Sequence, residues 1–425
     1  MSVREVGGGG RTGRPARTVS RPSHQERGPD PDTVLRILEE VRARENAWAS
    51  FVEELALMES PSTEPETQRP VQDLLTRTLE EVGYRVRRRP GSRSGGLLLA
   101  RPASPPSGPF QLLIGHCDTV WPVGTLQEMP VVRENGRIRG PGVFDMKGGL
   151  THVILALQVL RDLSLEPVVP PLILVNSDEE VGSHESTDAI VRMARRSCRA
   201  FVMEPALDPE GKIKTARKGT GRFSVRVTGR SAHAGLDPER GASAIQELAL
   251  VIQELHGLTD LERGLVVNVG EIRGGVRPNV VAAEATAEVD VRVNSIEDGA
   301  WLAERIRKIG ARIPGCRVEI RGGVDRAPLE RTPGNRILWE AARTLGATMG
   351  VPLEEGRAGG ASDGNTTSLS TPTLDGLGAV GDGAHALHEY VDISRSVERC
   401  ALLANLLLLP REPLAGGRSG VESER

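Results

Sequence analysis

The segment at residues 115–120, Gly-His-Cys-Asp-Thr-Val, places an imidazole and a carboxylate two positions apart. It follows the apolar run Leu-Leu-Ile at 112–114, which is typical of a buried strand. Polar and charged groups at the end of such a strand are costly unless they bind a partner. His116 and Asp118 are therefore the first candidates for a metal site.

Four further segments place acids or histidines in similar settings. They are Asp145 in a Gly-rich loop, the acids at 178–180, Glu204 after another apolar run, and residues 383–389. Asp145 could instead cap the helix that follows it, and the three adjacent acids could form a solvated turn. However, strand ends of open α/β sheets are where sites form, and a bound cation relieves repulsion between neighbouring acids.

Taken together, these segments favour metal-dependent hydrolysis. Two histidines and at least three carboxylates match a pair of Zn²⁺ ions with nitrogen and oxygen ligands. Such a pair suits amide hydrolysis, because one ion polarises the carbonyl and a bridging water loses its proton near neutral pH. An acid that binds no metal can then act as general base. We expect two Zn²⁺ per chain, with Co²⁺ or Mn²⁺ as alternatives.

The elements that must position these residues alternate between strands and helices. Apolar runs predict strands, and helical periodicity predicts helices between them. After about residue 219 the order becomes β-α-β-β-α-β, which matches a ferredoxin-like unit. We therefore expect an α/β fold in which a domain with a mostly parallel sheet is interrupted by a ferredoxin-like α+β domain. The main-domain predictions are strands at 85–89, 97–100, 111–114, 171–176 and 200–203, and helices at 34–58, 71–82, 147–163, 336–345 and 396–408.

The predicted domain boundaries follow from these patterns. The first segment is rich in Gly, Arg, Pro and Ser and has no apolar core, so it is expected to be disordered and is not a secretory signal. The boundaries are 1–32 for this arm, 33–219 and 329–412 for the two parts of the catalytic domain, 220–328 for the inserted domain, and 413–425 for a disordered tail.

Composition narrows the class of protein. The 425 residues are 38% hydrophobic and 26% charged, as in globular proteins. A net charge of −3 gives no reason to expect nucleic acid or an anionic membrane as partner. No apolar stretch is judged long enough to span a bilayer, so a cytoplasmic protein is expected. The four cysteines form no Cys-x-x-Cys pair, which argues against disulfides and zinc–thiolate sites, and Cys117 is expected to be a small buried residue.

The motifs, in their order, resemble those of the M20 metallopeptidase family, most of all its glutamate carboxypeptidase branch. Succinyl-diaminopimelate desuccinylase, acetylornithine deacetylase and aminoacylase-1 are similar. The resemblance runs from about residue 34 to 409. It implies a carboxypeptidase or deacylase that cleaves the amide bond of a C-terminal amino acid or an N-acyl amino acid, and a homodimer formed through the inserted domain. The motifs are Gly-His-Cys-Asp-Thr-Val, Gly-Val-Phe-Asp-Met-Lys-Gly-Gly, Ser-Asp-Glu-Glu, Met-Glu-Pro, Ser-Ala-His-Ala-Gly and Arg-Pro-Asn-Val-Val.

The resemblance implies a metal ligand set. Asp145 would bridge two zinc ions, His116 and Glu204 would complete one site, and Glu180 and His385 would complete the other. The last histidine is chosen over its neighbour at position 388 because the family's ligand stands four residues before a glutamate.

The resemblance also assigns catalytic roles. Glu179 would be the general base, and Asp118 would hold the ring of His116 in the right tautomer. The Asp145–Met146 peptide bond is expected to be cis.

The inserted domain carries further residues implied by the resemblance. His233 would reach across a dimer interface and stabilise the oxyanion in the partner's active site. Asn279 and Arg292 match positions that bind the substrate carboxylate, which an arginine can hold bidentately, although Arg292 could also be a surface strand residue. Gly360 lies in a Gly-rich loop whose amides could hold an anion.

Three alternatives remain at this point. A non-catalytic dimeric binding protein with the same fold would be expected to lack Glu179 or a ligand, and none is missing. A nucleotide-binding protein would carry Gly-x-Gly-x-x-Gly after a strand, which the glycine runs do not. A dipeptidase or aminopeptidase-like relative stays open, although Glu204 favours the acylase and carboxypeptidase branches. Glutamyl, aspartyl, acetyl and succinyl substrates are not distinguished.

Overall fold

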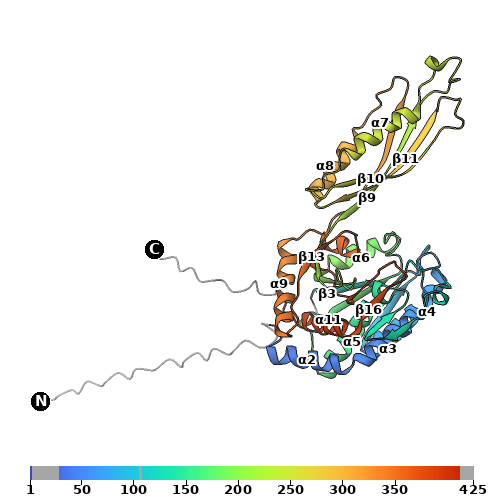
Figure 1. The fold of residues 1–425 in the computed structure, drawn as a ribbon. Helices are drawn as coiled ribbons and strands as arrows, with labels where there is room; N and C mark the ends of the chain where they lie inside the picture. The colour runs from blue at the N-terminus through green and yellow to red at the C-terminus, as the bar shows by residue number, and fades with distance from the viewer. Residues whose placement is uncertain (2–27, 105–107, 412–425) are drawn as a thin grey trace.

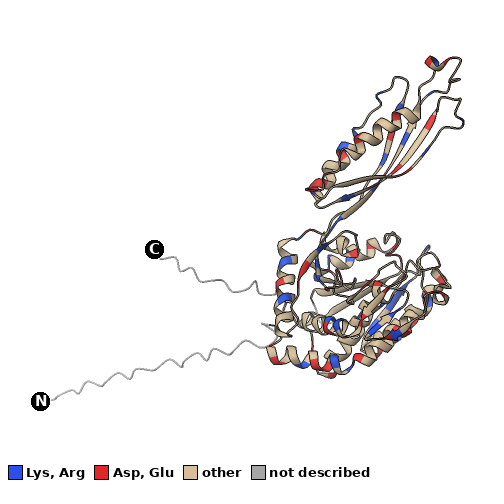
Figure 2. Cartoon of the chain, viewed as in Figure 1, with Lys and Arg blue, Asp and Glu red and all other residues tan. Residues whose placement is uncertain are grey.

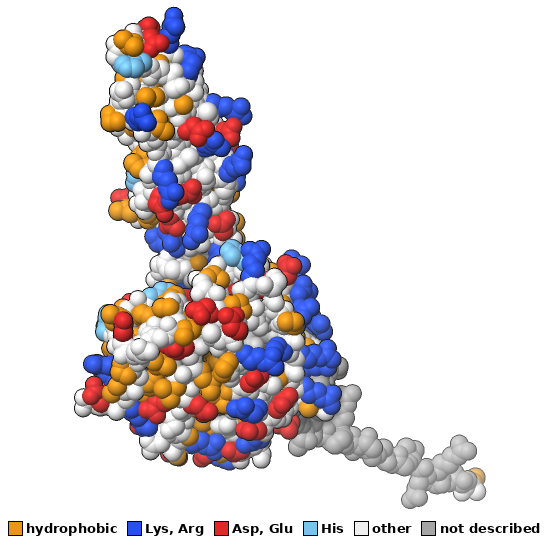
Figure 3. All heavy atoms as spheres, turned by 90° about the vertical axis from the view of Figure 1, so that its right-hand side faces the viewer, with side chains coloured by type: hydrophobic (Ala, Val, Ile, Leu, Met, Phe, Trp, Pro, Cys, Tyr) orange, Lys and Arg blue, Asp and Glu red, His pale blue; other side chains and the backbone are white. Residues whose placement is uncertain are grey.

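The computed structural model describes residues 1, 28–104 and 108–411, which form two parts joined by a narrow waist (Figures 1 and 3). Most of the predicted arm and the whole predicted tail lie outside these residues. Helix α2 (Pro31–Ala43) begins inside the predicted arm, where the side chain of Asp30 accepts a hydrogen bond from the amide of Thr33.

The larger part is built on a six-stranded sheet. Its strand order is β1-β2-β6-β3-β7-β14. The pairs β6–β3, β3–β7 and β7–β14 are parallel, and β1–β2 and β2–β6 are antiparallel, so the prediction of a mostly parallel sheet is confirmed. The strands are β1 (Tyr84–Arg89), β2 (Leu97–Pro102), β3 (Phe110–His116), β6 (Pro171–Asn176), β7 (Ser197–Val202) and β14 (Thr373–Leu374).

Helices cover both faces of this sheet, which is why its central strands are continuous apolar runs. Leu113 and Ile173 face the large core formed with α5 and α11, while their neighbours Leu112 and Leu172 face a smaller core formed with α6. The helices of the larger part are α2, α3 (Glu45–Ala56), α4 (Arg69–Glu81), α5 (Gly148–Asp162), α6 (Thr187–Ala194), α9 (Pro333–Thr348), α10 (Asp363–Ser368) and α11 (Ile393–Leu407).

Several short elements differ from the sequence-based prediction. The helix expected over 34–58 is two helices, because the chain leaves helical geometry at Arg44. Helix α6 and strand β8 (Ile213–Arg217) were not predicted, since one is short and the other, Ile-Lys-Thr-Ala-Arg, is half polar. The remaining short strands are β4 (Val132–Glu134), β5 (Arg137–Arg139), β13 (Glu355–Ala358), β15 (Gly381–Asp382) and β16 (Tyr390–Asp392).

The smaller part has its own sheet and its own core. Its strand order is β10-β11-β9-β12, and α7 and α8 pack on the sheet around the buried side chains of Phe223 and Val291. The chain order β-α-β-β-α-β confirms the predicted ferredoxin-like unit. The elements are β9 (Gly219–Thr228), α7 (Ala244–His256), β10 (Val266–Gly274), β11 (Glu284–Val293), α8 (Ile296–Arg307) and β12 (Arg317–Arg326).

Charge and hydropathy agree with a folded, mixed-charge protein. Acidic and basic residues are interspersed over both parts (Figure 2). Contrary to the sequence-based expectation, one helical segment of the described residues, Val143–Asp162, is long and apolar enough to cross a membrane by length and composition alone, but 89% of its apolar 18-residue window is buried inside the fold. All four cysteines are free, and Cys117 is buried.

Candidate active site

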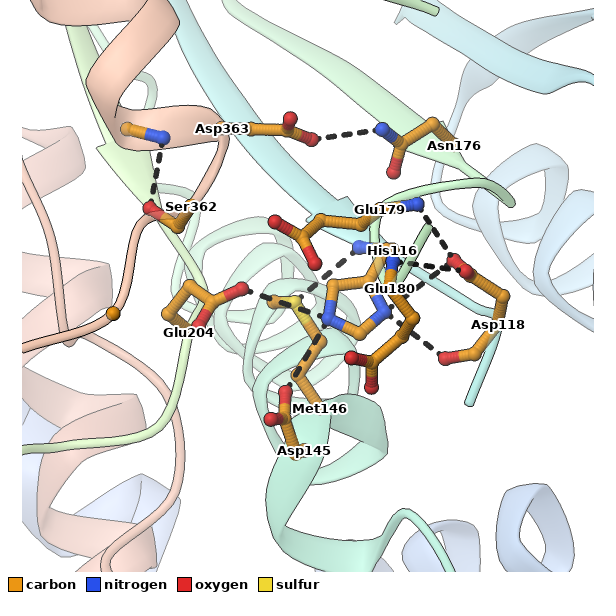
Figure 4. A network of polar contacts seen from close by, with 12 residues as sticks. His116, Asp118, Asp145, Met146, Asn176, Glu179, Glu180, Glu204, Ser362 and Asp363 are labelled. Atoms are coloured by element: carbon orange, nitrogen blue, oxygen red, sulfur yellow. Dashed lines mark hydrogen bonds and ion pairs between the residues drawn. The ribbon is translucent and has the colours of Figure 1, made fainter. Parts of the chain in front are cut away.

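The candidate site lies where the central parallel strands end (Figure 4), which is the edge at which open α/β sheets bind ligands. His116 is the last residue of β3, Glu180 follows β6, and Glu204 follows β7. Asp145 comes from the segment before α5, and His385 comes from the loop between β15 and β16. The five predicted metal ligands thus come from five separate segments.

Asp145 lies between the two histidines. Its Oδ1 is 3.3 Å from Nε2 of His116, and its Oδ2 is 3.5 Å from Nε2 of His385. The same His116 nitrogen is 3.5 Å from Oε1 of Glu204, and the His385 nitrogen is 3.1 Å from Oε2 of Glu180. The structure therefore brings the five residues together. His388 is exposed.

The donor atoms of this cluster fit metal ions. Nε2 of His116, Oδ1 of Asp145 and Oε1 of Glu180 are buried and have no hydrogen-bond partner among the residues that the structure describes, although buried polar atoms are nearly always paired. Ligand atoms of His116, Asp145 and Glu180 lie within 4.8 Å of one another, as do those of His116, Glu179 and Glu204. Imidazole nitrogens and carboxylate oxygens are suitable ligands for Zn²⁺. The second group also places Glu179, the expected base, within reach of an ion.

Asp145 does not cap the helix that follows it. Helix α5 begins at Gly148, its N-cap residue is Lys147, and no side chain caps it. The Asp145–Met146 peptide bond is cis, as expected. Gly149 allows α5 to approach β7 closely, because a Cβ there would lie 2.0 Å from the carbonyl oxygen of Met203. This contact holds the start of α5 beside the segment that carries Glu204.

Glu389 positions the Asp145 segment and was missed as a functional residue. Its buried carboxylate accepts hydrogen bonds from the amides of Gly142, Phe144 and Asp145 at 3.0, 2.9 and 3.1 Å, and from Nε1 of Trp121 at 2.9 Å. Burial raises the pKa of Glu389, and these amides oppose the rise. In the sequence analysis Glu389 was used only to select His385 as the ligand histidine. Its position four residues after that histidine was the one sequence feature that pointed to it.

Glu389→Gln is expected to destabilise the protein by about 2–4 kcal/mol, because the new amide N–H₂ would face donors and leave buried amides unpaired. Metal affinity should fall with it, since the segment carrying Asp145 loosens. Urea unfolding followed by tryptophan fluorescence measures the first effect. Glu340→Gln is the control, since its ion pair with Arg343 is exposed and is worth under about 1 kcal/mol. Equal stability of the two variants would contradict this role.

Asp118 contacts both His116 and the segment after β6. The ring Nδ1 of His116 donates to the backbone carbonyl of Asp118 at 3.0 Å and is 3.5 Å from its carboxylate, which leaves Nε2 facing the acids. The Asp118 carboxylate accepts from the hydroxyl of Ser62 at 2.6 Å and from the amides of Glu179 and Glu180 at 3.3 and 3.2 Å. Asp118 thus fixes one proposed ligand and the backbone of two further acids.

Two arginines that the sequence did not single out, the buried Arg217 and the partly buried Arg326, hold acids of the site. Arg217 donates to Glu204 at 3.0 Å and to Asp375 at 2.7 Å. Arg326, the last residue of β12, donates to Oε1 of Glu179 at 2.9 Å and to the hydroxyl of Ser183 at 2.7 Å. Both arginines lie where the chain passes between the two parts. Because they are distant in sequence from the acids they contact, no local sequence pattern could predict these pairs.

Burial and mutual charge govern the titration of the cluster. Burial raises the pKa of Glu180 to about 7, with the charge of Asp145 adding to it. Burial and the charge of Glu204 raise the pKa of Glu179 well above its usual range. Contacts with Asp145 and Glu180 raise the pKa of His385 to about 10. Because metal ions bind deprotonated ligands, an ion entering the cluster would displace protons from them.

The predicted residues of the inserted domain are not brought to this cluster within one chain. His233 is exposed, and its Nδ1 accepts from the amides of Gly235 and Leu236 at 3.1 and 3.2 Å. Asn279 is exposed, and Arg292 donates to Asp290 at 2.8 Å. Gly360 is nearer, since its carbonyl accepts from Arg217 at 3.2 Å.

Comparison with known proteins agrees with this fold. Residues 215–313 match the model of the M20 peptidase dimerisation domain. The chain is 29% identical to carboxypeptidase G2 of Pseudomonas sp. (strain RS-16) over 84% of this chain and 88% of the relative. It is 30% identical to acetylornithine deacetylase of Proteus mirabilis (strain HI4320) over 76% of this chain and 85% of the relative.

A solved structure shares the fold. The aminopeptidase PepT of Bacillus cereus superposes with a TM-score of 0.72 at 20% identity, covering 87% of this chain and 98% of that chain. Fold, site and relatives together define a hydrolase of the peptidase and amidohydrolase class. The chain belongs to the M20 family of metallopeptidases, and the relatives named above carry carboxypeptidase and deacylase activities in their names.

Proposed function

We propose that the protein hydrolyses the amide bond of a C-terminal amino acid or an N-acyl amino acid, using two divalent metal ions held by His116, Asp145, Glu180, Glu204 and His385. The observation that carries the proposal is the position of Asp145, whose two carboxylate oxygens face different histidines. A carboxylate in that position can serve two ions at once. Zn²⁺ suits the nitrogen and oxygen donors, with Co²⁺ or Mn²⁺ as alternatives.

Two such ions would supply Lewis-acid polarisation of the amide carbonyl and make water more acidic. Glu179 would take a proton from the attacking water as the new C–O bond forms, and would pass it to the leaving nitrogen when the tetrahedral oxyanion collapses and the C–N bond breaks. Arg326 holds one oxygen of Glu179, which fixes the direction of the other. Asp118 binds both the Glu179 amide and the His116 ring, and so fixes the position of one relative to the other.

The carboxypeptidase and deacylase names of the relatives favour a substrate with a free carboxylate beside the scissile amide. In the inserted domain, Asn279 and Arg292 are proposed to bind that carboxylate. The backbone of the loop at Gly360 is proposed to contact the substrate from the catalytic side.

The proposed roles of the inserted-domain residues require a second chain, because these residues are not brought to the metal-type cluster of their own chain. Among the described residues, His233 pairs with its neighbours in the smaller part of its own chain, namely Gly235, Leu236, Asp237 and Val280. The same part has an open sheet edge at β10 and exposed apolar side chains at Ile272 and Val276, which are 65% and 83% exposed. Exposed apolar side chains beside an unpaired strand favour association. We therefore propose a homodimer in which His233 acts in the partner's site and stabilises the oxyanion.

Mixed dimers test the action of His233. His233→Ala and Glu179→Ala should each be nearly inactive alone. When the two are mixed after reversible dissociation, about a quarter of wild-type activity should return, because half of the dimers are mixed and each has one complete site. A mixture as inactive as its parents would contradict action across the interface and favour action within one chain.

The reaction itself is tested by a substrate screen with and without added zinc. The panel pairs each N-acyl amino acid with its amide, which lacks the free carboxylate, and includes dipeptides and glutamyl, aspartyl, acetyl and succinyl compounds. Turnover only with the free carboxylate supports the proposal. Turnover that requires a free amino terminus and tolerates the amide would favour the aminopeptidase-like alternative.

A further inference from the structure

A cavity of about 350 Å³ lies apart from the metal-type cluster, between the end of β1, the start of β2 and helix α6. Its walls include Leu97 and Ala189, which belong to the smaller core on the α6 face of the sheet. The volume is at the lower end of the range for small-molecule sites. The basic strand at 84–89, to which the proposed function assigns nothing, ends at this cavity.

Asp178 lines the cavity, and one oxygen of its carboxylate accepts no hydrogen bond from the described residues. Asp178 is only 3% exposed, and its Oδ2 accepts from the amides of Glu185 and Ser186 at 2.8 and 3.2 Å. Its Oδ1 is buried and has no hydrogen-bond partner in the described part of the chain. Leaving such an oxygen unpaired is costly, so a ligand that donates a hydrogen bond there would be stabilised.

Two arginines line the same cavity without an ion pair among the described residues. Arg89 ends β1, and Arg192 lies in the last turn of α6, and both are exposed. Their neighbour Arg88, by contrast, is paired with Asp73. Arg192 belongs to α6, and the amides of Glu185 and Ser186, just before this helix, bind Asp178. The cavity therefore offers two cations and one buried acceptor.

The wall between these groups is held in place. The carboxylate of Glu185 accepts hydrogen bonds from the amides of Ser92, Arg93 and Ser94 at 2.9, 3.0 and 3.0 Å, and from both serine hydroxyls. Hydrogen bonds from Ser92 and Ser94 lower the pKa of Glu185 to about 2. Glu185 thus fixes the 92–94 loop, and its own acceptors are already used.

We propose that this cavity binds a free aliphatic α-amino acid. The ammonium group donates to Oδ1 of Asp178, the carboxylate binds Arg89 and Arg192, and the side chain packs against Leu97 and Ala189. A simple anion would meet the buried carboxylate unfavourably, and a simple amine would leave the arginines unpaired. Asp178 directly precedes Glu179, so the ligand would contact the segment that carries the proposed base.

Isothermal titration of the full-length protein with L-leucine tests this site. Two probes each lack one charged end: 4-methylpentanoate has no amine, and 3-methylbutylamine has no carboxylate. L-Leucine should bind, and each half-molecule should bind at least about tenfold more weakly, because one charge-assisted contact is lost. No heat with L-leucine up to about 10 mM, or equal binding of 4-methylpentanoate, would overturn the proposal.

Variants separate this cavity from the active site, where an amino acid is also a product of the proposed reaction. Arg192→Ala and Arg89→Ala should each weaken L-leucine binding about tenfold, while Arg195→Ala, exposed just beyond α6 and outside the cavity lining, should not. Binding should be the same after metal removal with EDTA. Binding that disappears with EDTA and ignores Arg192→Ala would place the ligand in the active site, which overturns this inference and leaves the proposed function standing.

Discussion

Glu179→Ala is expected to lower kcat by about 10³-fold, within the range for loss of a general base, while KM changes little. The reason is that no other acid of the cluster is free for this role. Glu180, Glu204 and Asp145 each face a histidine nitrogen within 3.5 Å, whereas Glu179 contacts Arg326. Steady-state kinetics on the best substrate of the screen measure the effect, with the exposed Glu166→Ala as control.

Metal content distinguishes the two roles that the geometry allows for Glu179. As general base, its loss should leave two ions per chain. As a ligand, grouped with His116 and Glu204, its loss should remove one ion. Near wild-type turnover of Glu179→Ala would contradict the mechanism, and loss of one ion would reassign the residue.

Asp145→Ala is expected to reduce activity by at least about 10⁴-fold and to leave no more than one ion per chain, because a shared ligand serves both ions. Removing the carboxylate also leaves His116 and His385 without the acid between them. Glu180→Ala should lower the metal content less than Asp145→Ala does, by one ion per chain at most.

Asp162→Ala is the matched control for Asp145→Ala. Asp162 ends α5, the helix that follows Asp145, and forms exposed ion pairs with Arg44 and Arg161, which contribute little to stability. It should keep full activity and full metal content. An Asp145→Ala protein that still binds two ions tightly would show that the two sites share no carboxylate.

Three of the segments that carry candidate ligands could be located from local patterns, whereas the ligand set itself, including Asp145 and His385, was implied by the family resemblance. Apolar runs before His116, Glu180 and Glu204 identified buried strands, and parallel strands bring their carboxyl ends to one edge. The same runs predicted the mostly parallel sheet. The inserted β-α-β-β-α-β unit could be predicted because its strands alternate and its helices are amphipathic.

The residues that support the site could not be predicted in the same way. Arg217 and Arg326 contact Glu204 and Glu179 across 13 and 147 positions of sequence, and such pairs leave no periodic signal. Glu389 binds backbone amides, which carry no residue-specific signal at all. Asp118, predicted to hold the His116 ring, contacts that ring, and its carboxylate also accepts hydrogen bonds from Ser62 and from the two amides after β6.

The predicted boundaries of the inserted domain lie close to the ends of two strands, and they stay predictions. Strand β9 begins at Gly219 and β12 ends at Arg326, and the residues between them form a separate core. Limited proteolysis at these two connections would test whether the smaller part is an independent domain.

Metal content of the purified wild-type protein tests the central claim most directly. The protein is dialysed against metal-free buffer, its metals are quantified by mass spectrometry, and turnover is measured on the same sample before and after EDTA. The account predicts close to two divalent ions per chain, loss of turnover on chelation, and recovery on adding zinc. Full turnover with a metal content near zero would contradict it.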